Sequence, residues 1–119
     1  MSARIISLGW SLPAYTTDAD LTQGESVTLA FTAATTTDVT TWTIVGYLKQ
    51  YHDSATVTLT LTASGLTSAG AFSLALTGAQ SQALVVQSWQ LQVWRTDSGS
   101  ETVLSNVIVN VLEGQQTLP

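Results

Sequence analysis

The sequence contains no cysteine and few charged residues among its 119 positions. Without cysteine the chain forms neither a disulfide nor a thiolate metal site, and the redox compartment is left open. Charged residues make up 9% of the chain, against about 25% in an average soluble domain. The formal net charge is −5, from eight acidic residues and the three bases Arg4, Lys49 and Arg95. Nucleic acid and anionic membranes are recognised by clustered Lys and Arg, so neither is an expected partner.

Long apolar runs are also missing, although 45% of the residues are hydrophobic. This excludes a transmembrane helix. The single histidine, His52, stands beside Asp53, but adjacent loop side chains usually point apart and no nucleophile motif accompanies them. One histidine without cysteine is also a poor metal site. We therefore expect no enzymatic activity, no cofactor and no metal.

What the sequence does have is alternation with a period of two. Apolar and small or polar residues alternate in "SVTLAFT" (26–32), "TVTLTLT" (56–62), "AFSLALT" (71–77) and "SWQLQVWRT" (88–96). This pattern is typical of strands with one buried face. In "TWTIVGYLKQ" (41–50) two inward sets remain open, either Trp42, Ile44 and Leu48 or Thr43, Val45 and Tyr47.

Two further segments complete the expected strands. "TVLSNVIVNVLEG" (102–114) is expected to bury Val103, Val107, Val109 and Val111, and "RIISL" (4–8) is a candidate edge strand. "TDSGSE" (96–101) predicts a hairpin in which Gly99 takes a positive φ.

One helical turn is expected in "TGAQSQALVV" (77–86), where Thr77 and Gln80 have the spacing of a capping box. Short strands separated by regular turns indicate an all-β fold. We predict an antiparallel immunoglobulin-like β-sandwich of about seven strands with one short helical turn.

Four tryptophans are candidates for the core or for a contact surface. Trp42 and Trp89 fall at expected inward positions, whereas Trp10 and Trp94 are candidate interface residues. Trp94 shares its face with two glutamines, which suits either a subunit interface or a carbohydrate contact. We favour the interface, because interface centres gain aromatic residues and lose charge.

The threonine-rich strand is a second candidate contact surface. Thr56, Thr58, Thr60 and Thr62 share one face, and no charged residue occurs between positions 55 and 77. Edge strands that face water usually carry a charge that deters pairing. The threonine face is therefore expected either to be the outer side of a strand whose other side is buried, with no contact of its own, or to contact another subunit.

Several segments together resemble a protein family. "QGESVTLAFT" (23–32) followed by "TDVTTWT" (37–43), "GAFSLALTGAQSQAL" (70–84) and "SWQLQVWRTDSGSETVLSNVIVNV" (88–111) are similar to small immunoglobulin-like modules of tailed-bacteriophage virion proteins. The N-terminal domain of phage upper baseplate proteins is one such module. The resemblance covers roughly residues 21–111 and brings no catalytic or binding residues with it.

The resemblance implies a non-enzymatic protein located in the virion. The expected role is capsid decoration or a head or tail accessory, with capsid or tail subunits and further copies of the chain as partners. A tail or baseplate component, or a module that binds carbohydrate or the host surface, is the alternative. The expected organisation is a strand or arm at 1–21, the sandwich at 22–112 and a tail at 113–119.

Overall fold

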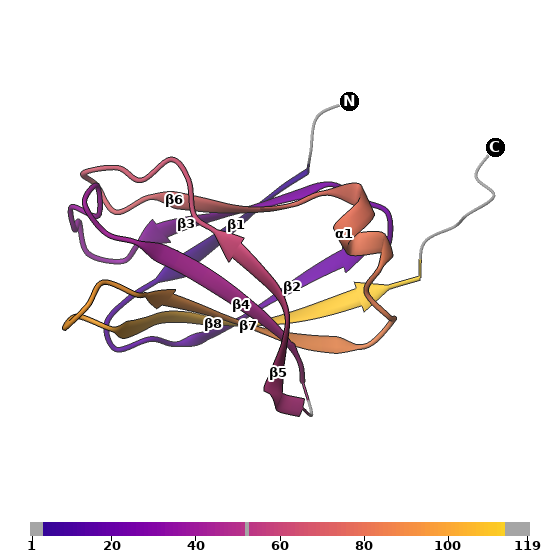
Figure 1. The fold of residues 1–119 in the computed structure, drawn as a ribbon. Helices are drawn as coiled ribbons and strands as arrows, with labels where there is room; N and C mark the ends of the chain where they lie inside the picture. The colour runs from indigo at the N-terminus through magenta and orange to yellow at the C-terminus, as the bar shows by residue number, and fades with distance from the viewer. Residues whose placement is uncertain (1–3, 52, 114–119) are drawn as a thin grey trace.

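The computed structural model describes residues 4–51 and 53–113, which form two β-sheets packed face to face (Figure 1). Within this part of the chain there are eight strands and one short helix. In chain order they are β1 (Arg4–Trp10), β2 (Thr16–Thr22), β3 (Val27–Ala33), β4 (Ile44–Gln50), β5 (Asp53–Thr62), β6 (Phe72–Leu76), α1 (Gly78–Gln82), β7 (Ser88–Arg95) and β8 (Thr102–Leu112). One sheet has the order β1-β3-β6, and the other has the order β2-β8-β7-β4-β5. The all-β sandwich with one helical turn is thus confirmed.

The sheets are mixed, which corrects the expectation of a purely antiparallel sandwich. β1 pairs in parallel with β3, and β2 pairs in parallel with β8, while the other strand pairs are antiparallel. A tight hairpin forces two strands to be antiparallel, but neither β1 nor β2 reaches its partner through a hairpin. The chain crosses from one sheet to the other between β1 and β2, so each can lie parallel to a distant strand.

Alternate residues of each strand fill the space between the sheets, as the period of two predicted. Phe31 and Phe72 stack at the centre of the three-stranded sheet, with ring centroids 5.0 Å apart. The buried hydrophobic residues are Trp10, Ala19, Leu21, Val27, Leu29, Phe31, Val39, Ile44, Leu48, Leu61, Phe72, Leu74, Leu76, Leu84, Trp89, Leu91, Val93, Leu104, Val107, Val109 and Val111.

Of the two possible inward sets in the segment 41–50, the structure has the one that contains Ile44 and Leu48. Ile44 and Leu48 are buried, whereas Val45 and Tyr47 lie half-buried on the outside. Gly46 lies between the two inward residues, and a Cβ atom there would come within 2.7 Å of the Leu74 Cδ1 atom in the opposite sheet. The absence of a side chain at this position lets the two sheets approach closely.

Strand β8 follows the expected inward face at Val107, Val109 and Val111 but not at Val103. A β-bulge shifts the register of β7 and β8, because Val93 pairs with Ser105 while Trp94 pairs with Val103. The extra residue, Leu104, is buried and Val103 is half-buried on the outer side. A bulge reverses the alternation beyond it, and a strictly periodic pattern misses this reversal.

The predicted helical turn is present, and its capping box is confirmed. The Gln80 backbone N–H donates to the Thr77 hydroxyl oxygen at 3.1 Å, and the Thr77 N–H donates to Gln80 Oε1 at 2.9 Å. The buried Ser81 hydroxyl donates to the Glu25 carbonyl at 2.7 Å. This bond fixes α1 against the turn between β2 and β3. The hairpin at Gly99 is also confirmed, with a φ of 83°.

The N-terminal segment, expected to be a strand or arm, contains two strands of the sandwich, and the candidate edge strand at 4–8 is confirmed as part of β1. β1 and β2 add a strand to each sheet, and Trp10, Ala19 and Leu21 are buried in the core. The Trp10 indole N–H also donates to the buried Gly70 carbonyl at 2.7 Å. Of the expected C-terminal tail, Glu113 is exposed and residues 114–119 lie outside the described residues.

Trp10→Ala is expected to destabilise the protein by about 3–5 kcal/mol, because it removes a buried aromatic side chain and leaves a cavity. Ile5→Ala on the same strand is the matched control, since Ile5 is 66% exposed. It should change the unfolding free energy by no more than about 0.5 kcal/mol. Urea unfolding followed by tryptophan fluorescence and circular dichroism measures both. Equal, small effects would mean that β1 does not belong to the folded core.

Candidate functional site

The structure separates the two candidate interface tryptophans. Trp10 is only 2% exposed, and its ring packs against Phe72 at 6.2 Å and Trp42 at 5.9 Å between ring centroids. Its indole N–H is already committed to the Gly70 carbonyl. The proposal of Trp10 as an interface residue is therefore wrong, because the sheets bury it inside the protein.

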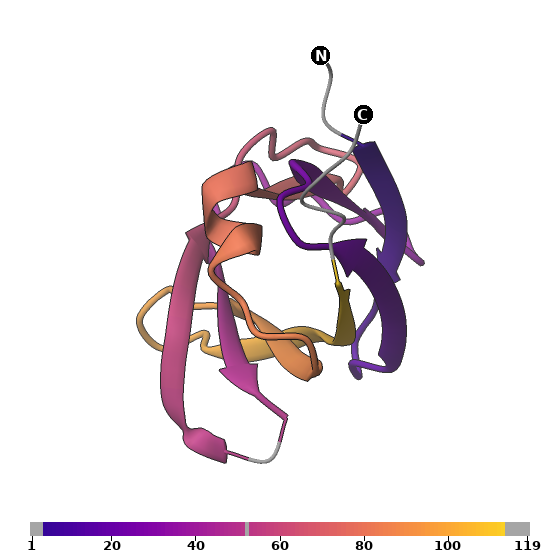
Figure 2. The same ribbon diagram turned by 90° about the vertical axis from the view of Figure 1, so that its right-hand side faces the viewer.

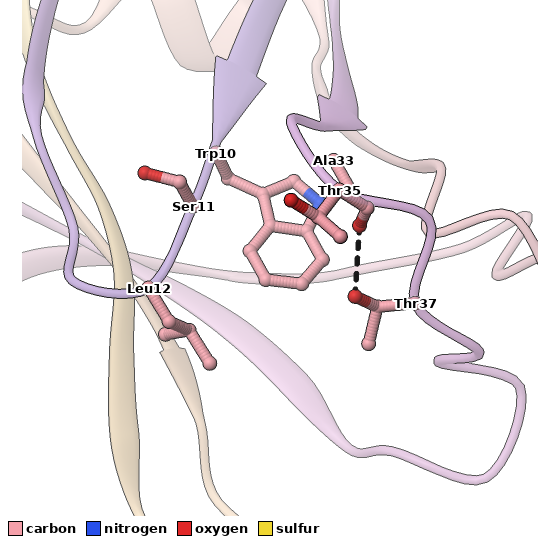
Figure 3. A pocket seen from close by; sticks show the side chains of 6 residues that line it. All are labelled: Trp10, Ser11, Leu12, Ala33, Thr35 and Thr37. Atoms are coloured by element: carbon pink, nitrogen blue, oxygen red, sulfur yellow. Dashed lines mark hydrogen bonds between the residues drawn. The ribbon is translucent and has the colours of Figure 1, made fainter.

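A small pocket lies beside Trp10 at one end of the sandwich (Figure 3). It encloses about 110 Å³ and is lined by Trp10, Ser11, Leu12, Ala33, Thr35 and Thr37. The Thr37 hydroxyl, which lines it, donates to the Thr35 carbonyl at 2.8 Å within the same loop. Drug-sized ligands occupy roughly 300–1,000 Å³, so this pocket is too small to be a site for one.

Trp94 lies on the outer face of the five-stranded sheet, as the alternation predicted. Gln90 and Gln92 share this face, and all three side chains are half-buried. The strand register places Val45 opposite Trp94 on one side and Val103 opposite it on the other. Trp94 therefore lies in an apolar cross-strand row near one end of the sheet.

Amide and hydroxyl groups occupy the middle of this outer face and bond to one another. Gln92 Nε2 donates to Asn106 Oδ1 at 3.2 Å, and the Ser88 hydroxyl donates to Asn110 Oδ1 at 2.9 Å. Asn110 Nδ2 in turn donates to Asp20 Oδ1 at 3.0 Å. These cross-strand bonds join β7, β8 and β2, so the polar side chains of the face are held in place before any partner arrives.

A shallow hollow crosses the same face. It measures about 530 Å³ and is lined by Thr16, Tyr51, Gln90, Gln92, Asn106 and Ile108. Its lining combines amide donors and acceptors with one aromatic ring and one aliphatic side chain. This volume falls within the range of small-ligand sites. Trp94 is not among the lining residues.

Few charges lie on this outer face. Among the described strand residues that the register places there, Lys49 carries a positive charge and Asp18 and Asp20 carry negative charges. Both aspartates stand on β2, at one edge of the sheet. The centre of the face can therefore lose its water with little charge desolvation.

The threonine face lies on β5, at the opposite edge of the same sheet. Thr58, Thr60 and Thr62 are exposed, and the register sets Thr60 opposite Tyr47 and Thr62 opposite Val45. Thr56 belongs to the strand, but its side chain lies outside the described part of the structure. Thr60 and Thr62 thus extend the outer face to its edge, whereas Thr58 lies at a β-bulge, without a register partner on β4. Sequence analysis missed this continuity because the alternation of one strand does not show its neighbours.

A second hollow, of about 360 Å³, opens where β5 meets α1. Thr58, Leu59, Ala79, Gln80, Ala83 and Leu84 line it. Apolar atoms dominate this lining, in contrast to the amide-rich hollow on the outer face. Sequence alone gives no signal of this hollow, because it forms between a strand and a helix from different parts of the chain.

The carboxylates with shifted pKa values belong to turns and loops. A hydrogen bond from Arg95 Nε at 2.8 Å lowers the pKa of Asp97, and the Thr43 backbone N–H lowers it further. A hydrogen bond from Arg4 lowers the pKa of Glu25, and the Thr40 N–H lowers that of Asp38. These groups are stabilised as anions, which suits structural pairing and not proton transfer at neutral pH.

The Asp97 pair also connects to the core. The Arg95 guanidinium lies over the Trp42 ring, 4.1 Å from the ring centroid. Trp42 is only partly buried, and it packs against the core beside Trp10. Trp42 is therefore partly in the core, as predicted: its ring packs against Trp10, and the Arg95 guanidinium lies over it.

No metal-binding cluster is present in residues 4–51 and 53–113, where no group of three His, Cys, Asp or Glu side chains comes together. His52 lies outside the described residues. In the same part of the chain, no helix is long and apolar enough to cross a membrane. The fold and its surfaces define the chain as a mixed β-sandwich with one broad, weakly charged outer face. No protein-family model matches the chain. A search of curated proteins also gives no match.

Asp97→Asn should weaken the acid sensitivity of the fold. Because the folded state lowers the pKa of Asp97, the stabilisation is complete above the ordinary value of 3.8 and is lost as pH falls below it. The difference in thermal midpoint between wild type and Asp97→Asn should therefore shrink as the pH is lowered from about 7 to about 3. Asp97→Asn in an Arg95→Gln background should show a smaller pH-dependent difference. A difference independent of pH would contradict the assignment.

Proposed function

We propose that this chain is a non-enzymatic structural or accessory subunit of a tailed-bacteriophage particle. In this role it decorates the capsid or serves as a head or tail accessory, through protein–protein contacts between repeated copies. The alternative is that the chain is a component of the tail or baseplate. The partners are capsid or tail subunits, and the location is the virion.

The observation that carries the proposal is the outer face of the five-stranded sheet. It joins an apolar row at Trp94 to a prearranged amide cluster at Gln92 and Asn106, with few charges. Interface centres are depleted of charge and enriched in aromatic residues, and a few such residues carry most of the binding energy. A face of this kind can bury against a protein neighbour at low desolvation cost.

Two features of the sequence support the choice of partner. The segments at 23–32, 70–84 and 88–111 resemble the immunoglobulin-like modules of phage virion proteins. The net charge of −5, with only three basic residues, disfavours nucleic acid and anionic membranes. A protein surface in a symmetric particle remains the best-fitting neighbour, since many weak copies then add avidity.

Trp94→Ala should weaken binding to particles at least about tenfold, because tryptophan is enriched among interface hot spots, whose truncation costs about 2 kcal/mol or more. The assay is co-sedimentation of purified protein with particles of a phage that encodes the chain but was grown without it. Separate runs with isolated heads and isolated tails distinguish the two locations. Leu12→Ala is the control, since Leu12 is 53% exposed at the end of the sandwich. Wild-type protein that binds neither heads nor tails would refute the proposal.

A second candidate function is binding of carbohydrate on a host or particle surface. The hollow of about 530 Å³ favours it, because amides from Gln90, Gln92 and Asn106 and the ring of Tyr51 line one open depression. Amide side chains both donate and accept hydrogen bonds, which suits the hydroxyl groups of a sugar. Tyr51 lines this hollow, and Trp94 is not among its lining residues.

For the second candidate, Asn106→Ala should abolish binding on a glycan array, because it removes one of the amides that line the hollow. Trp94→Ala should leave glycan binding intact, which is the reverse of the pattern expected for particle binding. Thr28→Ala, on the outer side of the other sheet, is the matched control. Wild-type protein that binds no glycan would exclude this candidate.

A further inference from the structure

The hollow of about 530 Å³ lies on the outer face of the five-stranded sheet. The three-stranded sheet and α1 both lie on the inner side of that sheet (Figure 2). The described part of the chain therefore leaves the hollow open to a ligand. The strand register fixes which side chains stand next to one another around it.

Two cross-strand rows of side chains form most of the lining. In the first row, Thr16 on β2, Asn106 on β8 and Gln92 on β7 stand side by side. In the second row, Ile108 on β8 stands beside Gln90 on β7. The hollow therefore presents one hydroxyl, three amides and one aliphatic side chain on three neighbouring strands.

The amides of Asn106 and Gln92 form a fixed pair within this lining. Gln92 Nε2 donates to Asn106 Oδ1 at 3.2 Å. The bond leaves Asn106 Nδ2 as a donor and Gln92 Oε1 as an acceptor, and no other described residue bonds to either atom. A hydroxyl group both donates and accepts hydrogen bonds. Two adjacent hydroxyls of one ligand can therefore bond to this pair, one as the acceptor and the other as the donor.

Apolar surface lies next to the amide pair. Ile108 is half-buried on the same face of β8, two residues from Asn106. Tyr51, which directly follows β4, adds an aromatic ring to the lining. A sugar ring has apolar C–H groups on its faces and hydroxyls around its edge. A ring that lies over Ile108 can bury those C–H groups and still reach the amides.

None of the described residues that line the hollow is charged. Outside the lining, Asp18 stands next to Ile108 on β2, and Lys49 stands next to Gln90 on β4. Because these two charges are opposite, their potentials offset each other between them. A carboxylate that entered the hollow would lose water without gaining a cation among the described lining residues, and such burial is costly. A neutral ligand avoids this cost.

We propose that the hollow binds an uncharged sugar through two adjacent hydroxyls. These hydroxyls bond to the amide pair of Asn106 and Gln92, and the C–H groups of the ring lie over Ile108. This ligand class rests on the second candidate function, carbohydrate binding, and narrows it to neutral saccharides. Uronic and sialic acids are excluded, because each carries a carboxylate that the lining does not neutralise.

Nuclear magnetic resonance titration of the nitrogen-15-labelled chain tests the ligand class. The probes are the methyl pyranosides of glucose, galactose and mannose, and the methyl glycosides of the corresponding uronic acids. Each acid differs from its hexoside only by a carboxylate in place of the hydroxymethyl group. At least one hexoside should shift the side-chain amide signals of Asn106 and Gln92 saturably, and its acid should bind at least about tenfold more weakly.

The two ways in which this titration can fail are distinguishable. An acid that binds as tightly as its hexoside would overturn the restriction to neutral sugars and leave carbohydrate binding in place. Hexosides that all fail to shift the amide signals would overturn the proposed site. Glycan-array binding then shows separately whether the second candidate function also fails.

Gln92→Glu tests the amide pair, because it replaces the N–H that holds Asn106 and adds a charge to the lining. Binding of the hexoside should weaken at least about tenfold. Gln87→Glu is the matched control and should bind like wild type, since Gln87 is exposed and does not line the hollow. The backbone amide spectrum confirms that each variant is folded. Wild-type affinity in a folded Gln92→Glu variant would overturn the role of the amide pair.

Discussion

The burial of one face of each sheet against the other is the interaction on which the rest of this structure depends. With no disulfide possible and few ion pairs, the apolar residues between the sheets supply the main stabilisation, at roughly 25 cal/mol per Å² buried. Because successive side chains of a strand alternate, filling the core assigns every second residue to the inside. The remaining residues form two outer faces, and the strand edges keep their free backbone groups. Any function that does not disrupt the core must therefore use an outer face, an edge or a loop.

The sequence predicted what is local and missed what depends on distant pairing. Alternation placed Trp89 inside and Trp94 outside, and the spacing of Thr77 and Gln80 marked the helix cap. Each of these features is set by residues that are neighbours along the chain. The parallel pairing of β1 and β2, the bulge at Leu104 and the burial of Trp10 depend on segments far apart in sequence. Alternation along one strand carries no information about its neighbours, so neither the amide cluster at Gln92 and Asn106 nor the hollow beside α1 could be predicted.

One end of the sandwich shows how a weakly charged protein uses the few charges it has. Asp97 accepts hydrogen bonds from Arg95 and from the Thr43 N–H, and Arg95 covers the exposed side of Trp42. Trp42 packs on Trp10, whose indole reaches the Gly70 carbonyl in the other half of the chain. The Arg95–Asp97 ion pair thus lies over the aromatic residues at this end of the core. It does not lie on the broad outer face, which has few charges. An exposed ion pair by itself contributes little to the stability of a protein. Here the arginine also makes a cation–π contact with Trp42, and this contact adds to the stabilisation.

The edge and the outer face also constrain each other. Thr60 and Thr62 on β5 carry the outer face to the edge of the five-stranded sheet, opposite Tyr47 and Val45 on β4. Side chains larger than threonine at these two positions would form a ridge beside the row that contains Trp94. A flat, uncharged edge therefore leaves that row accessible to a partner, and a partner with repeated subunits would gain avidity from many such contacts.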